Sequence, residues 1–193
     1  GSGFQLMAGT APSGSDVDGD WAFIQKLAVD VGGKVYAATN TGLKYFDGAA
    51  WVYARVGAED LMGKSCDVVN FDGTTITAVS GLTYVSTGGF TDFVLKSTDE
   101  EGMLPTGSFG NIKFAISPSN SNYIYASYVD EDGALFNTYL STDKGESWRV
   151  VYPGGSSMDD IFNGQGLRNN SIAVDPNNEK VVYIGAYNLH KGF

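Results

Sequence analysis

Four aspartates could, by type and position, supply a catalytic pair of carboxylates. Two carboxylates that face each other across a cleft can hydrolyse a glycosidic bond, with their roles set by the distance between them. Asp30 and Asp175 each end an apolar run, where an aspartate usually caps a turn. Asp159 and Asp160 fall in an irregular stretch and form, we expect, a solvated loop pair. We therefore assign no catalytic residue.

The same irregular stretch, at about 152–170, is the candidate ligand-facing loop. Besides Asp159 and Asp160 it carries Arg168 and Asn169, so it offers both charges and an amide. Loops hold binding residues more often than strands do. We expect any ligand contact made by this stretch to come from these four residues.

Metal and nucleophile chemistry has little support. The chain has one cysteine and one histidine, which excludes a multi-cysteine metal site and argues against a histidine-built zinc site. Asp16, Asp18 and Asp20 occupy the first, third and fifth positions of a calcium loop, but Trp21 and Leu27 stand where glycine and glutamate are required. We expect a flexible acidic loop, with calcium only as a weak candidate and no other cofactor.

Composition limits the partners. The 193 residues carry a formal net charge of −10, which argues against binding to nucleic acid or to an anionic membrane surface. No apolar run approaches the ~20 residues of a membrane-spanning helix, so we expect no membrane insertion. Glycine is frequent, with 26 residues, and tyrosine and phenylalanine number 11 each. This mixture predicts many short strands joined by glycine turns.

A repeated order of strands and turns predicts the architecture. Four apolar strand pairs align on Val35, Ile76, Ile124 and Val182, at spacings of 41, 48 and 58 residues. A strand-only repeat of about 40–50 residues is typical of a β-propeller blade. We predict an all-β propeller of four-stranded antiparallel blades in preference to a sandwich, in a single segment over 1–193, with blades at about 24–53, 66–95, 112–151 and 170–193.

The predicted propeller is incomplete. About three and a half to four blades cannot close a ring of the usual size, and the fourth repeat stops, by this interpretation, after its second strand. Residues 1–20 would give a strand at 4–9 and the acidic loop. An apolar flank around Val181, Tyr183 and Leu189 would stay uncovered. We expect the rest of a longer propeller, or another chain, to complete the ring.

A hairpin motif stands near the end of the third repeat. Residues 141–148 read Ser-Thr-Asp-Lys-Gly-Glu-Ser-Trp, in which Asp143 would accept turn amides, Gly145 would supply a positive φ and Trp148 would pack beneath the loop. Ser141 opens the motif. A shorter version, Asp47-Gly-Ala-Ala-Trp51, lies at the equivalent place in the first repeat. We predict a structural role for Ser141, Asp143, Gly145 and Trp148.

This motif matches the Asp-box pattern, Ser-x-Asp-x-Gly-x-x-Trp. With this motif, residues 114–186 resemble the secreted bacterial Asp-box propellers of the sialidase-repeat (BNR) and sortilin-like kind, and the run at 164–176 resembles large exported Bacteroidetes-type proteins. The run at 42–51 resembles the repeat of sensor-type propellers from the same bacteria. The resemblance implies a bacterial protein placed outside the cell, on its surface or in the periplasm. It also implies a protein or glycan partner.

Three functions are compatible with this resemblance. A sialidase needs an arginine triad, and the chain has only Arg55, Arg149 and Arg168, of which Arg149 follows the box tryptophan on an outer strand. We therefore expect a non-enzymatic binding or scaffold module. The alternatives are the N-terminal part of a propeller glycoside hydrolase of the sialidase or xyloglucanase kind, and a periplasmic sensor propeller.

Overall fold

The fold consists of four antiparallel sheets in chain order. A computed structural model describes residues 3–10, 21–155 and 160–192. The first sheet contains β1 (Ile24–Val29), β2 (Val35–Thr39), β3 (Gly42–Phe46) and β4 (Trp51–Tyr53). The second contains β7 (Ser65–Phe71), β8 (Thr74–Val79), β9 (Leu82–Ser86) and β10 (Val94–Leu95). A small hairpin, β5 (Arg55–Val56) with β6 (Glu59–Asp60), joins the two sheets.

The second half of the chain repeats this plan. The third sheet contains β11 (Asn111–Ile116), β12 (Ile124–Val129), β13 (Leu135–Ser141) and β14 (Arg149–Pro153). The short helix α1 (Gly166–Asn169) precedes the fourth sheet, which contains β15 (Ser171–Asp175), β16 (Asn178–Gly185) and β17 (Leu189–Gly192). The predicted spans agree with these sheets to within two residues at each end.

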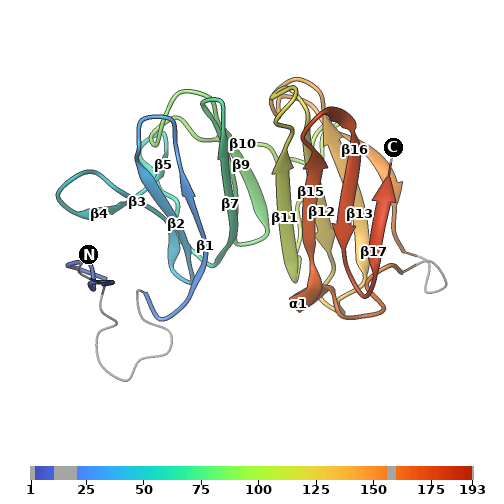
Figure 1. Cartoon of the computed structure of the whole chain (residues 1–193), viewed down its shortest axis with the longest axis horizontal. Coiled ribbons are helices and arrows are strands. Elements are labelled where there is room, and N and C mark those ends of the chain that lie inside the picture. Colours follow the sequence, from blue (N-terminus) through green and yellow to red (C-terminus); the bar gives the residue numbers. More distant parts are fainter. Residues whose placement is uncertain (1–2, 11–20, 156–159, 193) are drawn as a thin grey trace.

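The first strands of the four sheets lie next to one another. β1 lies beside β7, β7 beside β11, and β11 beside β15, and the later strands of each sheet extend outward from this row (Figure 1). The four sheets are thus consecutive blades around an inner row of strands. The chain is an all-β propeller segment with three four-stranded blades and a fourth blade of three strands.

Apolar cores lie between the blades. Tyr36 and Leu43 of the first blade pack with Val68 of the second, and Ile76 of the second packs with Ile112 and Trp148 of the third. Tight two-residue turns keep the strands in register so that alternate side chains meet these cores. At the β7–β8 turn, Asp72 and Gly73 both have positive φ, as that hairpin turn requires.

Two predictions about the chain ends are wrong. Residues 3–10 form no strand, and Phe4 and Leu6 are exposed, so neither apolar side chain anchors this segment to a sheet. The rest of the predicted N-terminal strand and loop segment lies outside the described residues. The fourth repeat does not stop after its second strand: a tight turn at 186–188 lets β17 pair with β16 as a third strand.

The predicted uncovered flank of the fourth blade is only partly confirmed. Leu189 is exposed and Tyr183 is partly buried, but Val181 is buried. No helix among the described residues is long and apolar enough to cross a membrane.

Candidate ligand-binding site

The predicted turn at 141–148 has the expected geometry. Asp143 accepts a hydrogen bond from the Ser147 backbone amide at 2.9 Å, and Ser141 Oγ accepts one from the Gly145 amide at 2.8 Å. Burial by itself would raise the pKa of the Asp143 carboxyl, but hydrogen bonds from Ser147 and Ser141 outweigh it and lower that pKa. The turn therefore favours an ionised aspartate.

Trp148 and Gly145 join this turn to the neighbouring blade. The Trp148 side chain is 4 % exposed, and its Nε1 donates to the Gly145 carbonyl oxygen at 3.1 Å. Gly145 has φ +89°, and a Cβ atom there would lie 2.9 Å from Cγ2 of Val85 in the second blade. The predicted burial of Trp148 is confirmed, and the turn closes the contact between two blades.

The residues of the candidate ligand-facing loop have different roles in the structure. Asp160 Oδ1 accepts backbone amides of Leu135 and Phe162, both at 3.0 Å, and its Oδ2 accepts that of Gly164 at 2.8 Å. Both oxygens of Asp160 thus hold backbone in place, which the sequence did not indicate because Leu135 is 25 residues away. Asp159 lies outside the described residues.

Arg168 and Asn169, the other two candidates, lie exposed on α1. Asn169 Nδ2 donates to Gln165 Oε1 at 3.0 Å, one turn earlier in the chain. None of Asp160, Arg168 and Asn169 lines either of the two hollows described below. For these three described residues, the structure therefore shows no shared ligand site.

The carboxylates considered for catalysis are turn caps. Asp30 Oδ1 accepts the amides of Gly32 and Lys34, and Asp175 Oδ1 accepts the amide of Asn177, at 2.8–2.9 Å. The predicted capping role is confirmed for both residues. The calcium candidates Asp16, Asp18 and Asp20 lie outside the described residues, and within the described ones no three His, Cys, Asp or Glu side chains form a metal-binding group.

The single cysteine and the single histidine lie on strands. Cys66 is partly buried on β7, where burial raises the pKa of its thiol, and its Sγ donates to the Ile112 carbonyl oxygen at 3.6 Å. His190 lies on the partly exposed β17, as predicted. Cys66 is held between blades, away from any paired base.

An ionic cluster around one buried carboxylate links the inner strands. Asp67 of β7 is fully buried and accepts the Phe114 amide at 2.9 Å, while Lys26 Nζ of β1 and Lys113 Nζ of β11 lie 3.4 and 3.9 Å from its Oδ1. One carboxylate thus binds three blades. A buried charge is stable only with such partners, so this cluster is structural.

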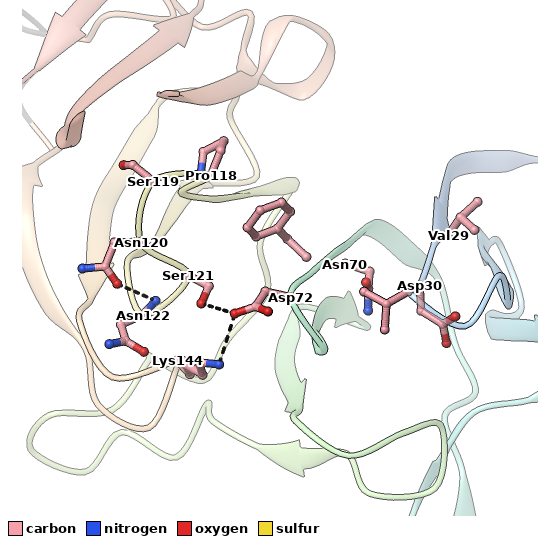
Figure 2. A pocket seen from close by; sticks show the side chains of 12 residues that line it. Val29, Asp30, Asn70, Asp72, Pro118, Ser119, Asn120, Ser121, Asn122 and Lys144 are labelled. Atoms are coloured by element: carbon pink, nitrogen blue, oxygen red, sulfur yellow. Dashed lines mark hydrogen bonds and ion pairs between the residues drawn. The ribbon is translucent and has the colours of Figure 1, made fainter. Parts of the chain in front are cut away.

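A hollow of about 780 Å³ lies where the first turns of three blades meet, and we call it the turn hollow. Figure 2 shows Asp72 beside Ser121 and Lys144, with Asn70 and Asp30 farther along. Backbone and side chains of the β1–β2, β7–β8, β11–β12 and β13–β14 turns line it: Val29, Asp30, Val31, Asn70, Phe71, Asp72, Pro118, Ser119, Asn120, Ser121, Asn122 and Lys144.

Hydrogen bonds and charge hold one wall of the turn hollow. Ser121 Oγ donates to Asp72 Oδ2 at 2.6 Å, and Lys144 Nζ lies 3.6 Å from the same oxygen. The Ser121 hydrogen bond, followed by the Lys144 charge, lowers the pKa of the Asp72 carboxyl. The wall combines an anion, a cation, hydroxyls and amides, which can donate and accept hydrogen bonds.

Sequence reasoning missed the turn hollow because its residues lie in separate repeats. The turn at 70–73 and the turn at 118–122 each have an ordinary turn composition. A possible signal was Phe71, an aromatic residue next to a hairpin tip, whose side chain is 39 % exposed. Aromatic side chains commonly line concave ligand sites.

Comparisons with known proteins support the fold. No protein-family model matches the sequence, and no curated protein matches it. Among solved structures, an ancestral GH74 enzyme is similar over 88 % of this chain, with 19 % identity and a TM-score of 0.60. A GH74 xyloglucanase from Xanthomonas campestris is similar over 82 % of this chain, with 15 % identity and a TM-score of 0.58.

A third similar structure is the GH74 enzyme of Niastella koreensis, with 25 % identity over 82 % of this chain and a TM-score of 0.50. The chain covers 22 %, 25 % and 21 % of the ancestral, Xanthomonas and Niastella enzymes respectively, so it spans about a quarter or less of each. The fold of this chain is therefore that of part of a β-propeller, and it corresponds to a portion of each of these longer chains.

Proposed function

We propose that this chain is a non-enzymatic β-propeller module that binds a glycan in the turn hollow. The observation that carries the proposal is the lining of the hollow, in which hydroxyl, amide and charged groups from three blades surround the exposed ring of Phe71. Sugars offer many hydroxyl groups for such polar partners and an apolar ring face for an aromatic side chain.

The non-enzymatic part of the proposal rests on the aspartates. Asp30, Asp160 and Asp175 are engaged with backbone amides. The carboxyl groups of Asp47, Asp72, Asp99 and Asp143 have lowered pKa values, whereas a general acid in glycoside hydrolysis needs a raised one. These seven carboxyl groups are therefore better suited to stabilising turns than to acting as a general acid.

The test is a binding titration of the 193-residue chain with a xyloglucan oligosaccharide and with cello-oligosaccharides, by isothermal calorimetry. Phe71→Ala should weaken binding about tenfold, since the ring supplies the apolar contact. Phe136→Ala is the matched control, because Phe136 is 38 % exposed on β13 and does not line the turn hollow. Equal effects of the two substitutions, or no glycan binding at all, would refute the proposal.

A second candidate is part of a propeller glycoside hydrolase. The three GH74 enzymes similar to this chain favour it, and the remaining catalytic groups would then belong to parts of a longer protein. The distinguishing measurement is release of reducing sugar from xyloglucan in the same samples. Binding without hydrolysis supports the module, and hydrolysis by this chain would establish the enzyme.

The same proposal places the protein outside the cytoplasm of a bacterium, on the cell surface or in the periplasm. The support is the resemblance of the 141–148 turn and its flanking repeats to exported Asp-box propellers. Fractionation of the native host, followed by immunoblotting, should find the protein in the periplasmic, surface or medium fraction. Its recovery in the cytoplasmic fraction alone would contradict this placement.

A further inference from the structure

A second hollow, of about 700 Å³, opens between the third and fourth blades, and we call it the blade cleft. One wall comes from β12, β13 and β14, and the other from β16 and β17. The pairing of Thr138 with Tyr152 and of Ile184 with His190 places these four residues on the two facing surfaces. The cleft shares no lining residue with the turn hollow.

The blade cleft is basic in an acidic protein. Arg149, Lys180, His190 and Lys191 line it, while no Asp or Glu of the described residues does. Lys191 Nζ lies 5.9 Å from the ring centre of Tyr183, on the surface away from the third blade. Arg149 and Lys180 leave two positive charges along the cleft, beside the His190 ring, in a chain whose net charge is −10. Such a local reversal of charge attracts anions.

Two buried polar atoms in the blade cleft have no hydrogen-bond partner among the described residues. They are Oγ1 of Thr138, whose side chain is 1 % exposed, and Nε2 of His190. Leaving a buried polar atom unsatisfied costs about 1–3 kcal/mol, so nearly all such atoms in folded proteins are paired. The Thr138 hydroxyl and the His190 Nε2 thus lie at the wall of the cleft with unused hydrogen-bonding capacity.

Between these polar groups the walls are apolar. Tyr125 and Leu140 from the third blade face Val182 and Ile184 from the fourth. Tyr125 keeps its hydroxyl occupied, because it donates to the Glu179 carbonyl oxygen at 3.0 Å. A ligand of this cleft therefore needs an anionic group for the basic residues and a compact body with an apolar face.

We propose that the blade cleft binds an acidic sugar unit, in which a carboxylate or a sulfate ester pairs with Arg149 and a ring hydroxyl bonds to Thr138 or His190. Arginine presents a planar set of donors that matches both anions. The ring of a sugar supplies the apolar face. This inference does not depend on the turn hollow, because no residue is shared.

The experiment titrates the 193-residue chain with D-glucuronate, glucose 6-sulfate, glucose and inorganic sulfate, by calorimetry and by NMR of the His190 ring. His190 is the single histidine, so its ring signals report on the cleft without ambiguity. We expect glucuronate or glucose 6-sulfate to bind and to shift these signals, with glucose at least about tenfold weaker. Added salt should weaken binding, as for any charge pair.

Two substitutions test whether Arg149 and Thr138 contact the ligand. Arg149→Gln should weaken binding about tenfold, whereas Arg55→Gln should not, because Arg55 pairs with Asp60 on the β5–β6 hairpin. Thr138→Val keeps the shape of the side chain and removes a buried hydroxyl that has no partner among the described residues, so it should weaken binding without lowering stability. It thereby separates a ligand contact from a structural one.

Three outcomes would overturn the inference. The first is that neither acidic sugar binds or shifts the His190 signals. The second is that glucose or inorganic sulfate binds as tightly as the acidic sugars, which would remove the charge or the sugar from the recognition. The third is that Arg149→Gln and Arg55→Gln have the same effect, which would place the binding elsewhere.

Discussion

The third and the first blade each contain a turn with the tryptophan motif. The two turns differ in how deeply the tryptophan side chain is buried. In the third blade Trp148 is buried among residues of two blades, and its Nε1 donates to Gly145. In the first blade Trp51 is half-buried against Trp21 and Phe46, and its buried Nε1 has no partner within the described part of the chain.

The two aspartates differ in the same direction. Asp143 accepts both the amide and the hydroxyl of Ser147 and also the hydroxyl of Ser141. Asp47 accepts only the amides of Ala49 and Ala50, on an exposed turn. The motif therefore forms a turn in both blades, but it stabilises contact between blades only where a preceding blade covers the tryptophan.

The largest expected effect is that of removing the buried tryptophan. Trp148→Ala should lower the free energy of unfolding by about 3–5 kcal/mol, because it opens a cavity in the core between the second and third blades. Trp51→Ala should cost less, since Trp51 is already partly exposed. Urea denaturation followed by circular dichroism measures both. Equal losses would show that the two turns are equivalent.

Removing the aspartate should also destabilise the third-blade turn more than the first-blade turn. Asp143→Ala should lower the free energy of unfolding by about 1–2 kcal/mol through lost hydrogen bonds in the turn. Asp47→Ala is the matched substitution and should cost less. If Asp143→Ala abolished glycan binding and left the unfolding curve unchanged, the turn would be a binding site and not a structural element.

A subtler difference concerns the indole nitrogens. Trp148→Phe removes a hydrogen bond to Gly145 and should cost about 1 kcal/mol more than Trp51→Phe, which removes a buried donor that has no partner. Both substitutions replace the indole by a smaller ring, and the packing lost at the more buried Trp148 adds to the difference in the same direction. Thermal melts of the two variants give the comparison, and a larger loss for Trp51→Phe would contradict it.

Acid should affect the third-blade turn through Asp143. The pKa of this carboxyl is lower in the folded protein than in the unfolded chain, so its contribution is present above the unfolded pKa and is lost as the pH falls through the folded value. With an unfolded pKa near 4, the loss occurs below about pH 4. Between pH 6 and pH 3 the free energy of unfolding should fall more for the unmodified protein than for Asp143→Asn. Equal decreases in the two proteins would show that Asp143 does not contribute to the acid sensitivity.

The blades could be predicted because their determinants are local. The apolar alternation around Ile76 or Ile124, and the glycine turns between strands, lie within one repeat. For the same reason, the sequence predicted that Asp143 accepts backbone amides in the turn at 141–148. The third strand of the fourth blade was missed because Leu189-His-Lys-Gly192 lacks an apolar pattern and is held by pairing with β16.

The two hollows could not be predicted, because each joins residues from different repeats. Asp72 meets Ser121 and Lys144 only after the second and third blades have packed side by side. Asp160 was a loop candidate by sequence, yet it caps backbone 25 residues away. Such contacts follow from the angle and spacing between blades, which no local pattern records.

The sequence by itself determined the strands, the turns and the tryptophan motif, since each depends on residues a few positions apart. Tertiary structure alone decided that Lys26 and Lys113 pair with the buried Asp67, and that Arg149 and His190 line one cleft. The physical reason is that blade packing excludes water. It fixes which charges and polar atoms, distant along the chain, must become each other's partners and which remain available to a ligand.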